Sequence, residues 1–194
     1  GSLSYYAQFF ETPMLGLRFR DLRAVLQYLR SRNDLKVKSF ALWGDSFQPP
    51  NAEGTDFQVP KRVSGRPKFS EPLGGLLALL GALFEDDVKA VFVRGGLSSY
   101  GDVLSGPYVY VPHDVVVPGV LNKGDLAAVA AALPPCRLKF DGMVDGLNRS
   151  LSVDKVRPQY AAAVKSYQAV APKSLSIANG RSNAASWLLG AKQD

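Results

Sequence analysis

The sequence predicts an α/β domain with a mostly parallel sheet and helices on both of its faces. Strand-like and helix-like segments alternate from the first helical segment to the last, which is the pattern of strand-helix-strand units. Residues 88–93 are apolar at almost every position, as in a strand that is buried on both faces. At 194 residues and 46% hydrophobic content, the chain is long enough to fill one core.

The first part of the chain predicts a helix, a strand and a long loop. Residues 17–32 form an amphipathic helix, because their apolar residues recur at helical spacing. These residues are Leu22, Val25, Leu26 and Leu29. A strand follows over 37–43. Residues 47–72 are rich in proline, glycine, asparagine and charge. They are expected to form an inserted loop, and a loop of that length in a compact domain is usually functional or mobile.

The middle of the chain predicts a buried helix over 73–84 and the buried strand over 88–93. Residues 97–122 are rich in aromatic residues and proline and have little periodicity, so we expect them to form a lid-like segment. A short alanine-rich helix follows over 125–133. Asp125 is well placed to cap it.

The last part of the chain predicts two strands and two helices. A strand is expected over 137–140 and a second over 174–178, with a helix over 158–171 between them. Pro158 would open that helix in its first turn. A final helix covers 183–192. Residues 3–194 therefore predict a single domain, and we exclude residues 1–2, Gly-Ser, as an expression scar.

Composition argues against several classes of partner and cofactor. The net charge is +6, but basic residues are interleaved with apolar and acidic ones, so we expect no dedicated nucleic-acid binding. No apolar run reaches membrane-spanning length, so no membrane partner is expected. The chain has one histidine and one cysteine, Cys136, which provide no internal disulfide and no ligand spacing for zinc. We expect Cys136 to be a small buried hydrophobic residue. We expect no cofactor.

The segment 37–48 carries the main functional signal. A strand-like run leads into Gly44, Asp45 and Ser46, as in a nucleophile elbow, where a serine lies on a tight turn between strand and helix. The second small residue of that motif is replaced by Gln48, so the motif is half matched. The alternative interpretation of Ser46 is an ordinary turn serine. Ser46, Asp145 and Asn179 all follow predicted strands, where parallel sheets bind ligands.

The order of these motifs resembles the C-terminal two-thirds of the α/β-hydrolases, in the branch of acetyl xylan esterases and dienelactone hydrolases. Residues 74–80, GGLLALL, match the helix that follows the nucleophile in that family. The resemblance implies an α/β-hydrolase-like sheet without its N-terminal strands, with Ser46 as nucleophile and the amide of Phe47 as oxyanion donor. It implies Asp145 as the catalytic acid, with Asp141 as a second candidate. Asp45 and Gln48 flank the serine and are expected to contribute to binding.

The chain departs from this family at the catalytic base. The family histidine lies in the loop after the last strand, where residues 177–183 contain none. The chain's single histidine is His113. It is either a base supplied from the lid-like segment or a surface residue paired with a carboxylate. A serine without a base is a poor nucleophile near neutral pH.

Two functions follow as alternatives. The first is a serine-esterase-like hydrolase that removes acetyl groups from carbohydrate esters, with Ser46, Asp145 and His113 as catalytic residues. The second is a catalytically inactive module that binds a carbohydrate or a protein, or has a structural role in a larger polypeptide. In that case Asp145 caps a turn beside Gly146. A sheet without its first strands would also leave an unpaired edge, which predicts a homo-oligomer or an adjoining domain that completes the sheet.

Overall fold

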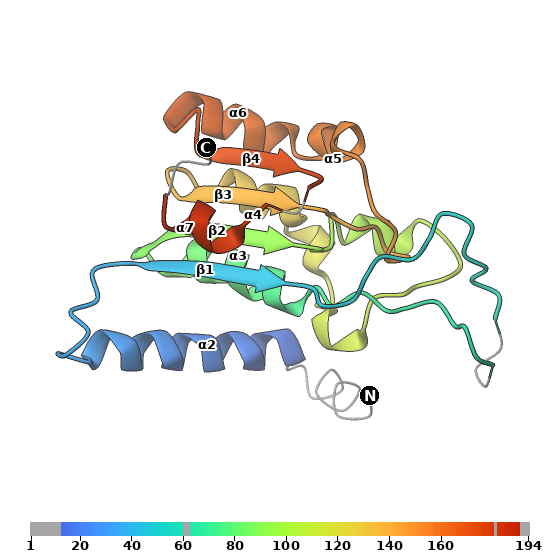
Figure 1. Cartoon of the computed structure of the whole chain (residues 1–194), viewed down its shortest axis with the longest axis horizontal. Helices are drawn as coiled ribbons and strands as arrows, with labels where there is room; N and C mark the ends of the chain where they lie inside the picture. Colours follow the sequence, from blue (N-terminus) through green and yellow to red (C-terminus); the bar gives the residue numbers. More distant parts are fainter. Residues whose placement is uncertain (1–12, 60–62, 181, 191–194) are drawn as a thin grey trace.

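The computed structural model describes residues 13–59, 63–180 and 182–190. These residues form a four-stranded parallel sheet in the order β1-β2-β3-β4, which confirms the predicted α/β class (Figure 1). The strands are β1 (Phe40–Asp45), β2 (Val88–Arg94), β3 (Arg137–Asp141) and β4 (Leu175–Ala178). Because all three pairings are parallel, the carboxyl ends of the four strands meet at one edge of the sheet.

The helices cover the two faces of the sheet unequally. They are α2 (Met14–Ser31), α3 (Leu73–Phe84), α4 (Leu126–Ala131), α5 (Val153–Gln159), α6 (Ala161–Val170) and α7 (Ala184–Leu188). Three 3-10 helices, η1 (Gly101–Leu104), η2 (His113–Val115) and η3 (Val120–Asn122), lie between β2 and α4. Each crossover connection leads to the adjacent strand on the same side of the previous one. Because such connections are right-handed, their helices lie on the same face of the sheet. Only the short α7, among the described helices, packs on the other face of β1 and β2.

The hydrophobic core lies between the sheet and the helices of the more heavily covered face. Along the central strands, Val91, Val93, Leu138 and Phe140 are at most 1% exposed, and strand register places them on one face. The Phe140 and Tyr160 rings lie 4.9 Å apart, which joins β3 to the junction of α5 and α6. Burial of this face supplies the main driving force for folding.

A close contact between glycines joins β1 to the helix that follows it. A Cβ atom at Gly44 would lie 2.2 Å from the carbonyl oxygen of Gly74, closer than any side chain allows. The first turn of α3 therefore packs directly on the backbone near the end of β1. This contact fixes the end of β1 and so the position of Asp45 and Ser46.

Several predicted boundaries shift in the structure. The residues after α2 form a turn in which Lys36 has a φ of 47°, so β1 begins at Phe40 rather than at Val37. Pro158 lies near the end of α5 and does not open the following helix, which begins at Ala161. Residues 191–192 of the last predicted helix lie outside the described residues. Asp125 caps α4 as predicted, because its carboxylate accepts a hydrogen bond from the Leu126 N–H.

Two further features concern the chemical environment. Cys136 is buried as predicted, and desolvation raises the pKa of its thiol to about 11. Within the described part of the chain, each helix is too short or too polar to cross a bilayer.

Candidate functional site

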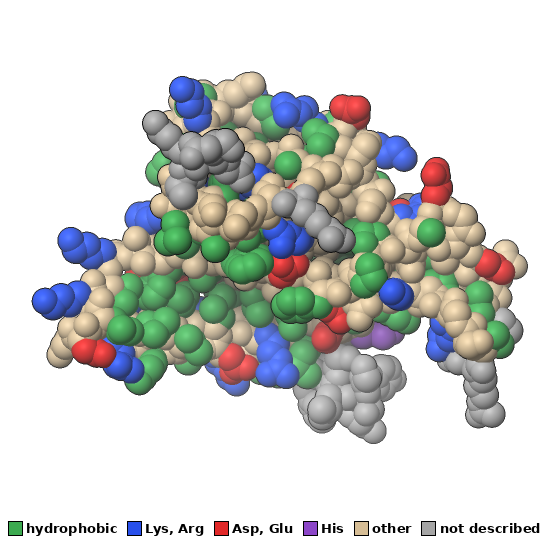
Figure 2. Space-filling view, viewed as in Figure 1, with side chains coloured by type: hydrophobic (Ala, Val, Ile, Leu, Met, Phe, Trp, Pro, Cys, Tyr) green, Lys and Arg blue, Asp and Glu red, His purple; other side chains and the backbone are tan. Residues whose placement is uncertain are grey.

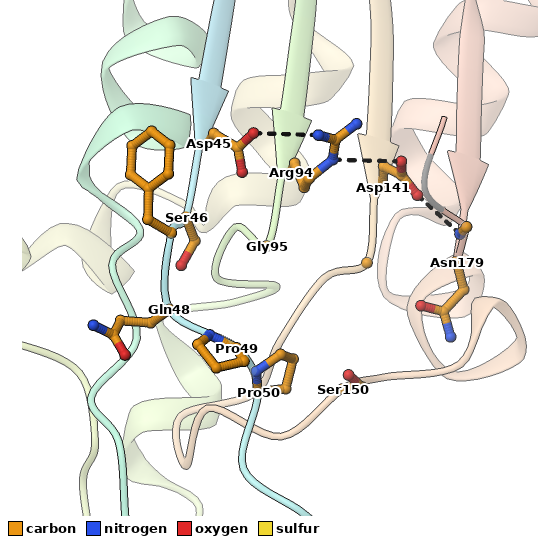
Figure 3. A pocket seen from close by; sticks show the side chains of 13 residues that line it. Asp45, Ser46, Gln48, Pro49, Pro50, Arg94, Gly95, Asp141, Ser150 and Asn179 are labelled. Atoms are coloured by element: carbon orange, nitrogen blue, oxygen red, sulfur yellow. Dashed lines mark hydrogen bonds and ion pairs between the residues drawn. The ribbon is translucent and has the colours of Figure 1, made fainter. Parts of the chain in front are cut away.

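An open cleft of about 640 Å³ lies at the carboxyl ends of the four strands (Figure 3). Each strand contributes its last residues or those that follow it. The lining residues are Asp45, Ser46, Phe47, Gln48, Pro49, Pro50, Arg94, Gly95, Asp141, Gly142, Ser150, Asn179 and Gly180. A parallel sheet binds ligands at this edge, and the volume suits a small molecule.

A row of three charged side chains crosses the floor of the cleft. Asp45, Arg94 and Asp141 are the last residues of β1, β2 and β3 and are direct neighbours in the strand register. Arg94 Nη1 donates to Asp45 Oδ2 at 3.3 Å, and Arg94 Nε lies 3.8 Å from Asp141 Oδ2. The guanidinium therefore lies between two carboxylates, and the row as a whole carries one net negative charge.

Asp141 also positions the loop after β4. Its carboxylate is 1% exposed and accepts hydrogen bonds from the backbone N–H groups of Gly180 at 2.9 Å and Ser182 at 3.0 Å. Arg94 Nη2 donates to the carbonyl of Ser182 in the same loop. Because its lone pairs already accept these bonds, Asp141 acts as an anchor for the loop that carries Asn179 and Gly180.

Ser46 lies at the end of β1, and its hydroxyl group lies beside Gly95 at the end of β2. The Ser46 N–H donates to the Arg94 carbonyl at 2.9 Å, which continues the β1–β2 ladder. A Cβ at Gly95 would lie 2.8 Å from the Ser46 Cβ, so the absent side chain makes room for the serine. Ser46 Oγ is buried and has no hydrogen-bond partner among the described residues. An orphaned hydroxyl in a cleft is an unusual feature that points to a ligand.

The tight turn expected at Ser46 is not formed. Among the described residues other than glycine, positive φ values occur at Lys36 and Asn148, so Ser46 lacks a left-handed backbone. The chain bends at Gln48 and reaches the next helix only at Leu73. The insertion 47–72 explains the difference, because a serine followed by a long loop does not have to reverse direction into a helix.

The residues next to Ser46 form one rim of the cleft. The Phe47 side chain is 85% exposed, and its backbone N–H makes no hydrogen bond to the described part of the chain. Gln48 lines the cleft beside it. Together they offer an amide donor, a side-chain amide and an aromatic ring to a bound molecule.

Asp145 lies outside the lining of this cleft. Its Oδ1 accepts hydrogen bonds from the N–H groups of Leu147 and Arg149, both at 2.9 Å. Its Oδ2 is paired with the Arg149 guanidinium at 2.8 Å. These are the bonds of a carboxylate that caps a turn. The structure thus brings Asp141 into the cleft with Ser46 and leaves Asp145 in the following loop.

His113 is exposed and lies in η2, which packs against α2 and α3. Neither His113 nor any other residue of the segment 97–122 belongs to the described lining of the cleft. The lining therefore holds two serines, Ser46 and Ser150, and two carboxylates but, among the described residues, no histidine. A proton acceptor for Ser46 would have to come from elsewhere.

Sequence reasoning missed the residues that hold the insertion 47–72 in place. The Asn51 side-chain amide donates to the Lys68 carbonyl and accepts a hydrogen bond from the Lys68 N–H. It also donates to the Leu147 carbonyl at 2.8 Å. Asn148 is 1% exposed, has a φ of 57°, and donates to the carbonyls of Pro49 and Lys68. These two asparagines join the insertion to the loop after β3, so the beginning and end of the insertion are fixed.

Arg94 was also missed, although the sequence carries a signal for it. Three strands each end on a charged residue, and parallel strands bring these ends together. Among the described residues, no group of three or more histidine, cysteine or acidic side chains is arranged to hold a metal ion.

Comparison with protein-family models, with curated proteins and with solved structures found no match for this chain. The structure itself establishes the α/β class. The more specific likeness to α/β-hydrolases rests on the sequence motifs alone.

Proposed function

We propose that this chain is a non-catalytic binding module whose cleft holds a small polar molecule of the carbohydrate class. One observation carries the proposal: the buried Ser46 Oγ lacks a partner among the described residues, while the described acids beside it are already engaged. Asp45 pairs with Arg94, and Asp141 accepts two backbone N–H bonds. The hydroxyl is therefore ready to bond a ligand but has no adjacent base.

The chemistry of the rim supports a carbohydrate. A sugar offers hydroxyl groups that bond side-chain amides and carboxylates, and a C–H face that packs on aromatic rings. The cleft offers Gln48 and Asn179 as amides and the exposed ring of Phe47 as an apolar surface. The negative row of Asp45, Arg94 and Asp141 disfavours an anionic ligand.

The second candidate is a serine esterase, and one observation favours it. The Phe47 N–H makes no bond to the described part of the chain, as expected of an oxyanion donor next to a nucleophilic serine. In this candidate Ser46 attacks the acyl carbonyl, Asp141 or Asp145 is the acid, and the base is His113 or a group from outside this chain.

Two measurements separate the candidates. A fluorophosphonate probe and p-nitrophenyl acetate test for a reactive serine, and a titration with xylo-oligosaccharides, followed through backbone amide resonances, tests for binding. We expect no labelling, and shifts confined to the cleft residues. Ser46→Ala should weaken binding about tenfold, as the loss of one hydrogen bond predicts. Ser64→Ala, an exposed serine of the same insertion, should bind as the wild type does.

The opposite result identifies the esterase. Labelling that Ser46→Ala abolishes, with turnover of the acetate ester, would replace the binding module by a serine hydrolase. Absence of both labelling and resonance shifts would reject both candidates for this cleft.

A further inference from the structure

β1 has a free edge. It is the outermost strand of the sheet, and no other strand of the described chain lies on its far side. The N–H groups of Phe40 and Ser46 donate toward β2, at 2.8 and 2.9 Å. Because backbone direction alternates along a strand, the N–H and C=O groups of Ala41, Trp43 and Asp45 point to the free edge. Such a row of unsatisfied groups is a template for another strand.

Beside this edge lies an apolar surface. α3 packs on β1 and β2, and α2 packs on α3 one helix further out, so α2 runs alongside β1 beyond the sheet (Figure 1). Figure 2 shows hydrophobic side chains gathered over β1 and the adjoining side of α2. Val25, Tyr28 and Trp43 are 53%, 57% and 51% exposed. We call these side chains and the outward backbone of β1 the β1 edge surface.

We propose that the β1 edge surface binds an extended segment of another polypeptide, which adds to the sheet as a fifth strand. The backbone of that strand would bond the outward groups of Ala41, Trp43 and Asp45. Its side chains would alternate between two faces, and those on the helix side would cover the apolar residues of α2. An amphipathic helix with half-exposed apolar residues next to an unpaired strand is complementary to such a segment.

The charged residues around β1 indicate which charge the added strand should carry. Lys36 and Lys38 are exposed just before the strand, and the chain has a net charge of +6. At the other end, Asp45 is already paired with Arg94. An acidic residue opposite the lysines would therefore strengthen binding and fix the position of the added strand.

A second copy of this chain does not fit the same edge. Helices pack about 10 Å apart and strands about 4.8 Å apart, so α2 spans roughly the next two strand positions. In a sheet formed from two antiparallel β1 edges, those positions would belong to β1 and β2 of the second copy. The α3 helix of that copy would then need the space that α2 fills. The added strand must be one without a helix on that side.

Selection from a displayed library of random peptides of about ten residues tests the proposal on the full chain. We expect peptides with alternating apolar residues and an acidic end. Bound peptide should slow amide hydrogen exchange at Ala41 and Trp43, whose N–H groups point outward. The N–H groups of Leu42 and Gly44, which face β2, should change less.

Two variants and one control locate the binding surface. Val25→Asp should weaken peptide binding about tenfold or more, because it places a charge under the added strand. Val170→Asp alters an apolar residue of α6 that is 62% exposed and should bind normally. Ala41→Pro removes one outward N–H without touching the bonds to β2 and should also weaken binding, provided its circular dichroism matches that of the wild type.

The proposal fails if the selected peptides bind Val25→Asp and Val170→Asp equally well, or if no peptide is selected. It also fails if the protein forms a dimer in sedimentation that Val25→Asp converts to a monomer, since the surface would then belong to a second copy. None of these three outcomes depends on whether the cleft binds a carbohydrate.

Discussion

The two faces of the sheet differ in chemistry, although they are made by the same strands. On the face toward α3, α4 and α6, the strands present Leu42, Val93 and Phe140, which pack into the core. On the opposite face they present Trp43, Arg94 and Lys139, under the short α7. The first face is held by apolar burial, whereas the second depends on paired charges and aromatic contacts. The difference assigns most of the folding stability to one face and the charged floor of the candidate site to the other.

Phe92 shows how the second face excludes water without a full helix layer. Its ring is 0% exposed. Trp187 of α7 lies 5.8 Å from it, and Trp43 lies 6.4 Å from it, between ring centroids. The Arg94 guanidinium and the Lys139 ammonium lie 5.2 and 5.9 Å from the same ring. Cations over aromatic rings thus replace part of the apolar packing found on the other face.

We expect the largest loss of stability from a substitution in the apolar face that packs on the helices. Phe140→Ala should lower the free energy of unfolding by about 3–5 kcal/mol, because it removes a fully buried ring and leaves a cavity. Denaturant unfolding measures the change. Phe47→Ala, a phenylalanine that is 85% exposed, is the matched control and should shift stability by less than about 0.5 kcal/mol. Equal effects at the two positions would show that burial on this face does not dominate.

The second prediction concerns the charges of the other face. Arg94→Met keeps much of the side-chain volume but leaves Asp45 and Asp141 without their shared cation. It should destabilise the protein by roughly 2–3 kcal/mol. Lys139→Met on the same face removes a cation that contacts Phe92, and it should cost less than about 1 kcal/mol. If Lys139→Met lowers the free energy of unfolding as much as Arg94→Met does, the row of Asp45, Arg94 and Asp141 is not the main stabilising feature of this face.

The third and smallest effect concerns the ion pairs that join α2 to the end of α3. Hydrogen bonds from Arg23 and Arg30 hold the pKa of Glu85 below its usual range. A carboxyl group with a lowered pKa stabilises the fold above its unfolded pKa of about 4.3. This contribution is lost as the pH falls through the lower folded pKa.

Glu85→Gln tests this contribution. Because both arginines are at least one-third exposed, the variant should lose only about 1 kcal/mol near neutral pH. Its stability should also fall less than that of the wild type below about pH 4. Thermal unfolding across this range measures both quantities. If the variant has the same pH dependence as the wild type, these ion pairs add nothing to the packing of α2 on α3.

Local sequence patterns were sufficient for most elements. The run 73–84 is apolar on nearly every side, and it forms α3 over that range. The strand over 88–93 is extended by one residue, to Arg94. Pro158 was harder to place, because proline is tolerated both at the start of a helix and near its end once tertiary contacts hold the chain.

The sequence predicted where the candidate site lies but not all of the residues that line it. Ser46 and Asn179 follow strands and line one cleft, as expected for a parallel sheet. The choice between Asp141 and Asp145 was not accessible from the sequence, because both residues closely follow the same predicted strand and lie only four positions apart. Only the backbone after β3 shows that Asp145 closes its own turn while Asp141 turns toward Arg94.

The sequence by itself determined which segments become strands and helices, because the period of apolar residues is a local property of each segment. It also determined that charged and hydroxyl groups gather at one edge, since parallel strands end together. Tertiary structure decided the rest: the pairing of Asp45, Arg94 and Asp141, the burial of Ser46 Oγ beside Gly95, and the open edge of β1. These features depend on register and packing between residues about fifty positions apart, which no local pattern encodes.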